Sequence, residues 1–584
     1  MAAMRPAAPF VLLHDARSGL DRARLYHAPR RVLAAQTPAE VHDVLAAIRS
    51  WPGAAAGFLS YGAGAAFEPA AGREPDCATP LAWFGLFDRH EEIADVAAWL
   101  PDAAGAWTGA PEPEPSRSDY RAMFEAAQAL IRAGDLYQLN LTFRARVPFI
   151  GDPLALYAGL RQAAGAGWSA LVATGAQTIL SLSPELFFTR DGDALVSRPI
   201  KGTARRNADP AIDLAVAHAL AADAKQRAEN LMIVDLMRND LSRVAVAGSV
   251  AVPELFAVER YPTVHQLTSK VTATLAPERH AVDVLSALFP CGSITGAPKV
   301  RAMQAIATVE RGTPRGTYTG AIGRIDADGS AAFNVAIRTL TIDEGADHAV
   351  IGIGGGIVAD SRVEDEWDEA MAKAAFLAGA RRRVDLLETM AFDPDEGVLR
   401  IERHLERLRT SAAALGFVFD RHAARNELQA ATFRLRAAAR VRLMVSQSGV
   451  VAIEVAAAPP APDRPLRVAL APLPVGERDW RLRHKTSDRR FYDAARAASG
   501  ADEVLFFTPD GRLTEGSYTN LFVPRGDTLR TPRAGPLLPG VLRGELLDSG
   551  KAVEDDLTVA DLRDGLFVGN ALRGLMRATL AVAQ

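Results

Sequence analysis

Two ionisable side chains stand at the ends of strand-like runs in SLSPELFFTRDGDALVSRPIKGTARR. Glu185 and Lys201 flank these runs, and the turn residues Asp191-Gly192-Asp193 separate them. A hairpin brings such side chains near one another. An acid beside an amine can protonate a departing hydroxyl while a new bond forms. A cross-strand ion pair is the structural alternative, and the pattern alone does not choose between the two.

Carboxylates on two predicted helices could hold a metal ion. The segment RAENLMIVDLMRNDLSRV carries Glu229 among apolar residues, and SRVEDEWDEAMAKAAF places Glu366 and Glu369 three residues apart, on one helix face. Carboxylates that face a common space suit Mg²⁺, which completes its octahedron with water and substrate oxygens. Solvated or paired acids are the alternative, because Lys373 follows Glu369 by four residues.

Three consecutive glycines, Gly354, Gly355 and Gly356, lie in IGIGGGIVADS. Glycine lets a backbone approach a ligand without a Cβ in the way and present N–H groups to a carboxylate. A glycine bulge is the structural alternative, and the run is not the dinucleotide-binding pattern followed by a helix. The longer stretch AAFNVAIRTLTIDEGADHAVIGIGGGIVADS predicts two strands joined through DEGAD.

A second lysine with a different environment occurs in LRHKTSDRRFYDAAR. Lys485 stands between basic neighbours, which we expect to lower its pKa and favour the neutral amine that a Schiff base requires. Thirty residues later Glu515 lies on the return strand of a predicted hairpin that turns at Asp510-Gly511. A lysine among arginines is more often part of a solvated face.

Two further segments of this region suit an anionic ligand. RHLERLRTSAAALGF predicts a helix that carries His404 and Arg407. In LLPGVLRGELL, a glycine turn enters another helix at Gly540, Val541 and Leu542, and the free N–H groups of a helix start suit a phosphate.

The composition limits the class of protein. The chain has 584 residues, 49% of them hydrophobic and 23% charged, with a net charge of −4. Such a length requires two or more domains, and neither a polyanion-binding surface nor a membrane span is indicated. The N-terminus lacks the long apolar region of a secretory signal, so we expect a cytoplasmic protein. Two cysteines cannot form a disulfide framework or a cysteine-based metal site.

The chain divides near residue 380, where an amphipathic helix in DEWDEAMAKAAFLAGARRR gives way to the strand pattern VDLLETMAF. A softer break, rich in proline and charge, falls at GAPEPEPSRSDY. We therefore expect segments 1–115, 116–380 and 385–584. Strands alternate with helices in each part, which indicates a mixed α and β fold.

Many ordered motifs of the first part resemble the chorismate-utilising enzymes, most closely their aminodeoxychorismate synthase component I branch. They are GDLYQLNLT, SLSPELFF, PIKGTARR, ENLMIVDLMRNDLSRV, YPTVHQLTSKV, FPCGSITGAPKVRAMQ, YTGAIG and GIGGGIVADS. The resemblance implies an α+β fold with large antiparallel sheets, an N-terminal subdomain over 1–115 and a catalytic domain over 116–380. It implies chorismate as substrate, Mg²⁺ as metal, and a separate glutamine amidotransferase subunit as the source of ammonia.

The resemblance also implies roles for matching residues. Lys201 would attack the chorismate ring at C2 while Glu185 protonates the departing C4 hydroxyl, after which ammonia adds at C4. Enzymes that make anthranilate have alanine in place of this lysine, and the isochorismate-forming branch uses a lysine near the position of Gln138. The other implied site residues are the metal ligands Glu229 and Glu369 with neighbouring Glu366, the histidine near the ring His265, and the substrate contacts Gly202, Thr203, Ser293, Tyr318, Arg338, Gly354, Gly355 and Gly356.

The region from about 385 to 580 resembles the fold type IV pyridoxal-phosphate enzymes, through ETMAF, HLERLRTSA, HKTSDR, TEGSYTNLF, LPGVLR and GNALRGL. This family includes aminodeoxychorismate lyase and the branched-chain and D-amino-acid aminotransferases. The resemblance implies a two-lobed domain over 385–584 that binds pyridoxal 5'-phosphate, with room for a homodimer formed through this domain. The implied cofactor-binding residues are Lys485 for the Schiff base, Glu515 for the pyridine nitrogen, Arg407 with Gly540, Val541 and Leu542 for the phosphate, and Asn570.

Together the two resemblances imply a bifunctional enzyme that makes 4-aminobenzoate for folate synthesis, in which the first part supplies the substrate of the second. An anthranilate-type synthase joined to an aminotransferase is the nearest alternative. A chorismate-binding scaffold without catalysis is a further one, and the presence of both lysines and their acids argues against it.

Overall fold

The computed structural model describes residues 5–16, 21–75, 77–261 and 264–581, and the chain forms two compact units. The first unit comprises Met1–Pro101, Ala110–Phe149 and Leu156–Ala380, and the second comprises Asp102–Gly109, Ile150–Ala155 and Arg381–Gln584. Pro262 and Thr263, within the motif YPTVHQLTSKV, lie outside the described residues. Among the described residues no helix combines the length and the hydropathy that a membrane crossing requires.

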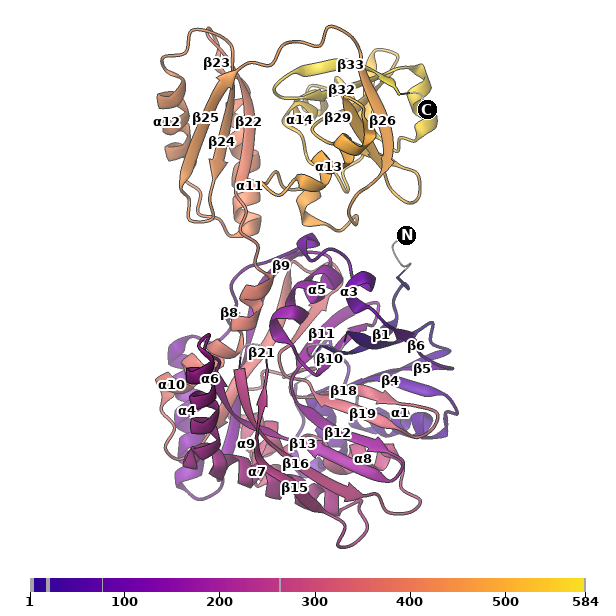
Figure 1. Ribbon diagram of the computed structural model, residues 1–584, viewed down its shortest axis with the longest axis vertical. Helices are drawn as coiled ribbons and strands as arrows, with labels where there is room; N and C mark the ends of the chain where they lie inside the picture. Colours follow the sequence, from indigo (N-terminus) through magenta and orange to yellow (C-terminus); the bar gives the residue numbers. More distant parts are fainter. Residues whose placement is uncertain (1–4, 17–20, 76, 262–263, 582–584) are drawn as a thin grey trace. The chain divides into compact units, whose positions relative to one another are not determined.

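The first unit is built on two large antiparallel sheets (Figure 1). One has the order β17 (Gly296–Ala297), β9 (Gln138–Gly151), β21 (His348–Ile357), β20 (Thr339–Asp343), β11 (Gln177–Ser183), β10 (Trp168–Ala173), β1 (Phe10–Asp15), β2 (Arg22–His27) and β6 (Glu91–Ile93), with β7 (Ala106–Thr108) and β8 (Glu112–Pro113) also paired to β9. The other has the order β14 (Ile200–Arg205), β16 (Val264–Thr274), β13 (Ala194–Arg198), β12 (Leu186–Asp191), β19 (Ala331–Val335), β18 (Ala321–Ile325), β4 (Ala54–Leu59), β5 (Ala82–Phe87) and β3 (Arg31–Ala35), with β15 (Ala251–Arg260) paired to β16.

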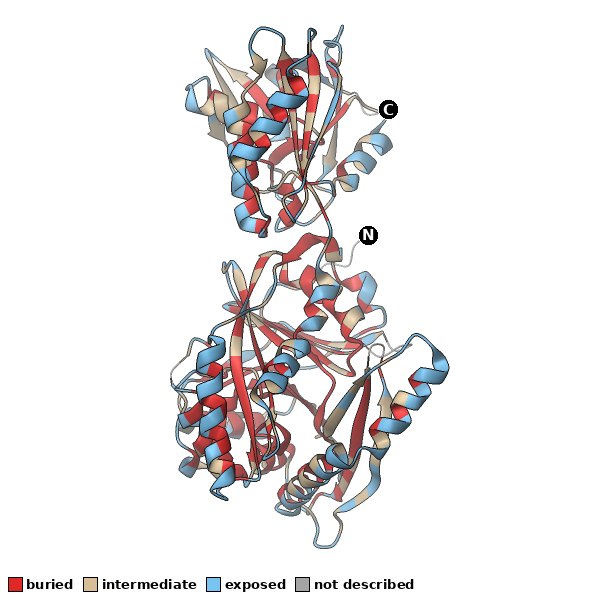
Figure 2. Ribbon diagram, turned by 90° about the vertical axis from the view of Figure 1, so that its left-hand side faces the viewer, coloured by how far each residue is buried: buried red, intermediate tan, exposed pale blue. Residues whose placement is uncertain are grey.

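Helices cover these sheets and bury one face each against them (Figure 2). They are α1 (Pro38–Ser50), α2 (Gly64–Phe67), α3 (Val96–Trp99), α4 (Arg117–Arg132), α5 (Pro153–Ala164), α6 (Pro210–Ala222), α7 (Ala224–Ser242), α8 (Ala281–Leu288), α9 (Lys299–Val309) and α10 (Val363–Lys373). The capping box of α4 shows how their starts are fixed, because the Ser116 side chain accepts from the Asp119 N–H while Asp119 accepts from the Ser116 N–H.

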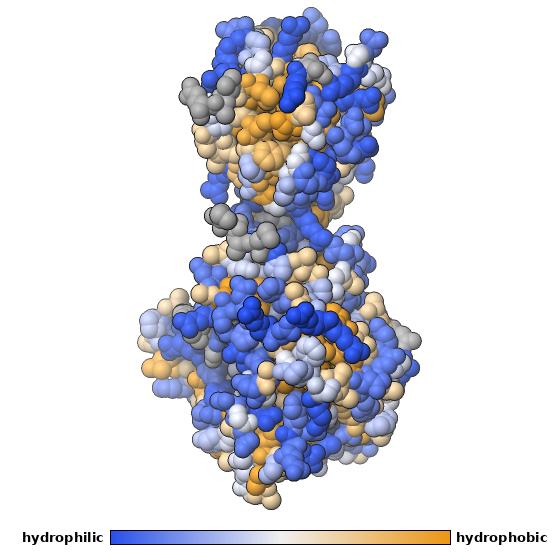
Figure 3. Space-filling model, turned by 90° about the vertical axis from the view of Figure 1, so that its right-hand side faces the viewer, coloured by the Kyte–Doolittle hydropathy of each residue, from blue (hydrophilic) through white to orange (hydrophobic). Residues whose placement is uncertain are grey.

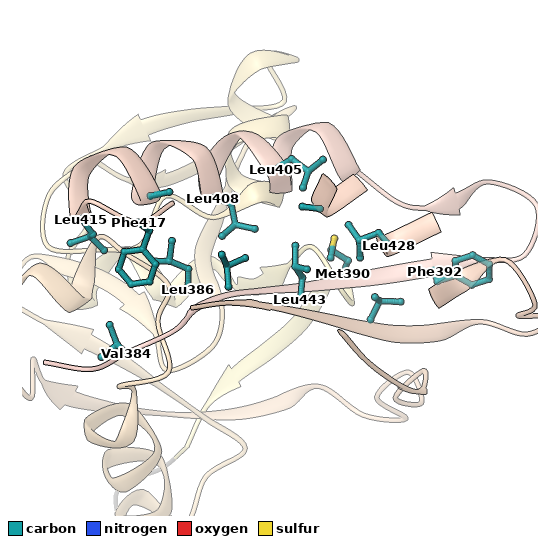
Figure 4. Close-up of a cluster of buried hydrophobic side chains, with 14 of the residues drawn as sticks. Val384, Leu386, Met390, Phe392, Leu405, Leu408, Leu415, Phe417, Leu428 and Leu443 are labelled. Atoms are coloured by element: carbon teal, nitrogen blue, oxygen red, sulfur yellow. The ribbon is translucent and has the colours of Figure 1, made fainter. Parts of the chain in front are cut away.

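The second unit has two lobes. The first lobe is a four-stranded sheet in the order β23 (Gly397–Val398), β22 (Leu386–Asp393), β24 (Ala439–Val445) and β25 (Val451–Ala457), with helices α11 (Ile401–Leu415) and α12 (Arg421–Thr432). Its core contains Leu386, Met390, Leu405, Leu408 and Leu443, which point between the sheet and α11 (Figure 4). The alternation of buried and partly exposed residues along β22 provides one face of this core.

The second lobe closes on itself. Its strands follow the order β28 (Leu513–Gly516), β27 (Glu503–Phe507), β26 (Leu466–Pro472), β33 (Gly574–Leu580), β32 (Leu566–Asn570), β29 (Asn520–Arg525), β30 (Thr528–Pro532) and β31 (Ala552–Asp555). Because β28 also pairs with β29, the first six strands form a closed ring. Helices α13 (Arg490–Ser499) and α14 (Val541–Asp548) complete this lobe.

The predicted mixed fold with large antiparallel sheets is confirmed, and so are both hairpins. Gly192 and Gly511 take positive φ at the turns, a conformation that glycine adopts without strain. The prediction of two strands over 331–357 was wrong, because three are present and β19 lies in a different sheet from β20. The break falls where Arg338 takes a φ of 49°, which ends the strand conformation.

Candidate active sites

Glu185 and Lys201 belong to neighbouring segments of the second large sheet. Glu185 directly precedes β12, Leu186 pairs with Arg198 on β13, and Lys201 is the second residue of β14. The Glu185 side chain is buried, and its Oε1 has no hydrogen-bond partner among the described residues. Burial raises the pKa of Glu185 to about 7, against the opposing effects of a hydrogen bond from Ser293, the Ile200 backbone and the charge of Lys201. Glu185 can therefore carry a proton near neutral pH.

The glycine run forms a wall beside the Lys201 amine. A Cβ added to Gly356 would lie 2.7 Å from Lys201 Nζ and 2.6 Å from Gln138 Nε2. Lys201 Nζ also lies 3.6 Å from Glu229 Oε2, a carboxylate of α7. The side chain of Gln138 is fully buried, and neither of its amide atoms has a hydrogen-bond partner within the described parts of the chain. Lys201, Glu229 and the Gly356 backbone thus surround one space in which polar groups remain unpaired.

Glu366 and Glu369 of α10 face the middle glycine of the run. A Cβ at Gly355 would lie 3.2 Å from Glu366 Oε2 and 3.8 Å from Glu369 Oε1. Burial raises the pKa of Glu366, and the negative charge of Glu369 adds to this effect. Lys373 Nζ, 2.9 Å from Glu369 Oε1, lowers the pKa of Glu369 and donates to the Gly354 carbonyl at 2.7 Å. The two acids therefore share one small region, with Lys373 as the nearest counter-charge to Glu369 and weaker contributions from Lys201 and Lys225.

The described residues contain no ready-made group of three or more His, Cys, Asp or Glu side chains arranged for a metal ion. An ion at Glu366 and Glu369 would thus take few protein ligands and complete its shell with water and substrate, as Mg²⁺ does. The hard carboxylate donors and the raised pKa of Glu366 fit a divalent cation, which would relieve the repulsion between the two acids.

The remaining predicted substrate contacts have different local environments. Burial lowers the pKa of Arg338, and no carboxylate pairs with it in the part of the chain that the structure describes. The Tyr318 ring packs on Gly352, where an added Cβ would come within 2.1 Å of it. Gly202 has a φ of 95°, and Thr203 is exposed on β14. Arg338 is therefore the guanidinium that is free to form a bidentate pair with a ligand carboxylate.

His265 is held away from Lys201 by another acid. Its Nε2 lies 2.8 Å from Asp213 Oδ1, and its Nδ1 has no hydrogen-bond partner among the described residues. Arg206 donates to the same carboxylate and is the main cause of its lowered pKa. His265 is buried and oriented by Asp213, with one ring nitrogen available.

In the second unit, Lys485 lies where the two lobes meet. Leu386 at the start of β22 bridges Thr486, and the Leu387 N–H donates to the Lys485 carbonyl at 2.8 Å. Burial lowers the pKa of the Lys485 amine to about 7; Glu388 opposes this shift, and Arg407, Arg489 and Arg442 add to it. The prediction named basic neighbours as the cause of the shift, but burial is the largest cause. Arg489 of the same segment contributes, while Arg407 and Arg442 come from other segments.

Arg407 is fixed by an acid that the sequence did not single out. Glu388 on β22 is fully buried and accepts from Arg407 Nε at 2.8 Å, from Arg407 Nη2 at 2.6 Å and from His404 Nδ1 at 2.6 Å. Arg407 Nη1 donates to the Pro539 carbonyl at 3.1 Å, which connects α11 to the turn before Gly540. Such a clamp fixes the orientation of the guanidinium plane.

The turn at Gly540 requires glycine. A Cβ there would lie 1.8 Å from Asn520 Oδ1, and Asn520 Nδ2 in turn donates to the Leu538 carbonyl at 3.2 Å. The first N–H groups of α14, from Val541 and Leu542, follow this turn. Asn570 shapes the adjacent loop, because its Oδ1 accepts from the N–H groups of Leu572 and Arg573.

Glu515 is a buried acid with a neutral partner. Tyr492 Oη donates to Glu515 Oε1 at 2.6 Å, and burial raises the pKa of Glu515 to about 7. Arg489 packs on the Tyr492 ring, and its Nη1 is buried without a hydrogen-bond partner among the described residues. A protonated pyridine nitrogen would supply Glu515 with the positive partner that it lacks, so these residues fit pyridoxal 5'-phosphate.

Comparisons with known proteins identify both halves. The chorismate binding enzyme model matches residues 6–379, and the amino-transferase class IV model matches residues 385–581. The chain belongs to the chorismate binding enzyme family. It carries a class IV aminotransferase domain in addition, whose fold supports pyridoxal 5'-phosphate as cofactor.

Relatives of the first half include two kinds of synthase. The chain is 41% identical to aminodeoxychorismate synthase component 1 of Escherichia coli over 343 residues, 55% of this chain and 75% of that protein. It is 37% identical to anthranilate synthase component 1 of Haloferax volcanii over 304 residues, 52% of this chain and 58% of that protein. The structure of anthranilate synthase component I from Streptococcus pneumoniae superposes with a TM-score of 0.53 at 25% identity, over 65% of this chain and 94% of that one.

The sequence analysis did not identify three residues that form part of these sites. Gln138 was noted only as the replacement for another branch's lysine, while Glu388 and Arg489 were not considered. Glu388 lies in ETMAF, where an acid on the inward-facing side of a strand was a readable signal. Arg489 has no such signal, because its importance depends on contacts with Tyr492 and Glu515.

Gly356→Ala should strongly reduce chorismate consumption, because a Cβ placed 2.6 Å from the Gln138 amide and 2.7 Å from the Lys201 amine forces these two side-chain ends to move. We expect a loss of at least about 100-fold, since a 1 Å displacement at a reacting centre can cost that much. The measurement is steady-state chorismate consumption. Gly476→Ala is the control, because an added Cβ there meets nothing within 4 Å. Unchanged turnover in Gly356→Ala would remove Lys201 from the reacting space.

Proposed function

We propose that the chain makes 4-aminobenzoate from chorismate and ammonia in two steps. The first unit would form 4-amino-4-deoxychorismate, and the second would release pyruvate from it. The observation that carries the first step is the buried and partly unpaired Glu185 carboxyl within the electrostatic influence of Lys201, because its pKa of about 7 leaves it protonated for part of the time at neutral pH. The similarity to aminodeoxychorismate synthase component 1 supports the same step.

We propose a task for each group of the first unit. The Lys201 amine would bond to C2 of the ring while the C4–O bond breaks, and Glu185 would give its proton to the departing hydroxyl, which leaves as water. Ammonia would then bond to C4 as the C2–N bond breaks and restores the Lys201 amine. Arg338 would hold a substrate carboxylate, and the N–H groups of Gly354 to Gly356 would line the same space.

We propose Glu229, Glu366 and Glu369 as the acids that hold Mg²⁺ beside the substrate. The ion would supply positive charge between a substrate carboxylate and two glutamates, whose oxygens lie 3.2 and 3.8 Å from the position of a Cβ on Gly355. Before the ion binds, Lys373 supplies the counter-charge to Glu369 and Lys201 the counter-charge to Glu229. Glu229 would help to hold the ion, whose positive charge would take the place of the Lys201 charge beside this carboxylate.

In the second unit Lys485 would act both as anchor and as base. Pyridoxal 5'-phosphate, when bound, supplies an electron sink for the charge that develops at C4. The Lys485 amine, with a pKa near 7, would remove the C4 proton as the bond from the ring to the enolpyruvyl oxygen breaks, which makes the ring aromatic and releases pyruvate. Glu515 would pair with the cofactor nitrogen, and Arg407 with Gly540 to Leu542 would hold its phosphate, together with the loop at Asn570.

Two partners belong to this proposal. Ammonia would come from a separate glutamine amidotransferase subunit, since Cys291 is buried beside Ser293 in the first unit rather than placed as a nucleophile. We also propose that the second unit pairs with a second copy of itself, which the hydrophobic side chains gathered on its surface support (Figure 3).

The direct test supplies purified protein with chorismate, Mg²⁺ and an ammonium salt and follows the aromatic product and pyruvate. We expect 4-aminobenzoate and pyruvate in equal amounts. Anthranilate as the product would contradict the proposal and favour an anthranilate-type synthase, the other kind of relative.

Lys201→Ala should lose formation of 4-amino-4-deoxychorismate, because the bond to C2 cannot form, while the second unit still converts supplied 4-amino-4-deoxychorismate. Loss of a covalent nucleophile should lower the rate by at least about 1,000-fold. Lys270→Ala removes a partly exposed lysine of β16 and serves as control. Product chromatography measures both steps, and a wild-type rate in Lys201→Ala would disprove the assignment.

Glu369→Gln should raise the Mg²⁺ concentration for half-maximal synthase rate by about 10-fold or more, because a site with few protein ligands loses one charge. Glu364→Gln makes the same change at an exposed position of α10 and should leave the titration unchanged. If the two variants titrate alike, the metal does not bind at Glu369.

Lys485→Ala should lack the visible absorption of a lysine-bound cofactor and accumulate 4-amino-4-deoxychorismate, since anchor and base are both removed. Glu515→Ala should bind the cofactor but turn over more slowly. Lys551→Ala, at an exposed lysine, is the control. Normal 4-aminobenzoate formation by Lys485→Ala would refute the proposed chemistry of the second unit.

A further inference from the structure

The second compact unit contains two segments that come from the first third of the sequence. Asp102–Gly109 and Ile150–Ala155 lie within the range that the chorismate binding enzyme model matches, yet they cluster with Arg381–Gln584. The two segments bond to each other, because the Asp152 N–H donates to the Gly105 carbonyl at 3.2 Å. Gly151 and Gly105 approach so closely that a Cβ on Gly151 would lie 2.2 Å from the Gly105 oxygen.

Trp107 extends this contact into the core of the four-stranded lobe. Its side chain is buried in the same hydrophobic cluster as Leu415, Phe417 and Trp480. The Trp107 ring lies 3.8 Å from the position of a Cβ on Gly416, the residue that ends α11. A large indole at such a place contributes strongly to packing, and its removal leaves a cavity that the surroundings fill only in part.

Polar contacts from the same segment fix the turn that precedes Lys485. Trp480 and Arg481 belong to a short 3₁₀ turn, Trp480–Leu482, and both are buried. Trp480 Nε1 donates to the Ala104 carbonyl at 2.8 Å, and Arg481 Nη2 donates to Asp102 Oδ2 at 3.0 Å. Since buried donors are costly to leave unpaired, these contacts restrain where the turn can lie.

The other side of this stretch is held by β22. The Leu387 N–H donates to the Lys485 carbonyl at 2.8 Å, and Leu386 bridges Thr486. The chain from Trp480 to Thr486 is therefore fixed at its start by Asp102 and Ala104 and at its end by the first lobe. His484 Nδ1 lies 3.0 Å from Ser411 Oγ and adds a further contact beside Lys485, so the Lys485 backbone is restrained from several sides.

We propose that Asp102, Ala104 and Trp107 are positioning residues for Lys485. A part of the sequence that belongs by family to the chorismate-binding half thereby completes the core of the class IV aminotransferase domain and orients its lysine. The inference rests on the proposed function of Lys485. It also implies that the range 385–581, matched by the aminotransferase model, lacks part of its own core.

The test uses the full-length chain with Trp107→Ala, Trp107→Phe and Trp480→Phe. Trp99→Ala is the matched control, because Trp99 is equally buried eight residues earlier but packs on Phe10 in the first unit. The readouts are the dissociation constant of pyridoxal 5'-phosphate, the pH titration of the visible band of the lysine-bound cofactor, and the thermal unfolding of the second unit.

Trp107→Ala should weaken cofactor retention by at least about 10-fold and lower the unfolding temperature of the second unit by about 10 °C. Trp107→Phe should restore most of both. Trp480→Phe, which keeps an aromatic ring but loses the donor to Ala104, should shift the pH titration of the band, a change that packing loss alone does not produce. Trp99→Ala should leave cofactor retention and the titration as in the wild type.

Lys485→Ala separates the two ways in which the account can fail. If Lys485→Ala loses the band while Trp107→Ala and Trp480→Phe retain the wild-type dissociation constant and titration, this inference is overturned and the proposed function stands. If Lys485→Ala keeps the band, the proposed function itself is overturned. If Trp107→Ala does not fold, the titration of Trp480→Phe decides, because an unchanged midpoint contradicts the positioning role.

Discussion

Removal of ionisable side chains from water is the constraint on which the reactivity of both units depends. A charged group that loses its hydration changes its pKa toward the neutral form unless a partner replaces the water. Burial brings the Lys485 amine down to about 7 and the carboxyls of Glu185 and Glu515 up to about 7. The ordinary pKa of a lysine is far from that of a glutamate. Burial brings all three pKa values close to neutral, so each group can gain or lose a proton near pH 7.

The fold supplies this burial by different means in the two units. In the first, β14 brings Lys201 beside the glycine run of β21, a strand of the other large sheet, and the glycines have no side chains to fill the space. In the second, Lys485 lies on the segment between β26 and α13 of the closed lobe, and this segment contacts β22 of the four-stranded lobe through the bridge of Leu386 to Thr486. Glu185 and Lys485 are buried in the two units, and Arg489 Nη1 is a buried donor without a hydrogen-bond partner among the described residues.

Local patterns in the sequence were sufficient to predict the secondary-structure elements but not the long-range contacts around them. The hairpins at Gly192 and Gly511 were predictable because turn residues between apolar runs act over a few positions. The break at Arg338 was not, since its positive φ depends on strands from two sheets meeting there. The cause of the lowered Lys485 pKa was misjudged for the same reason. The burial of the amine and its proximity to Glu388 result from long-range packing, which the residues adjacent in the sequence do not determine. No local signal places Trp107 in the core of the second unit.

The most direct test of this account is the pKa of Lys485 itself in cofactor-free protein. Competitive labelling of amines with trace acetic anhydride over a range of pH, followed by mass spectrometry of the Lys485 peptide, gives this value for the folded protein and for the unfolded chain. The account predicts a midpoint near pH 7 in the folded protein, which returns to about 10.4 when the chain is unfolded. A midpoint close to the unfolded value in the folded protein would contradict it, because the amine would then be hydrated and protonated at neutral pH.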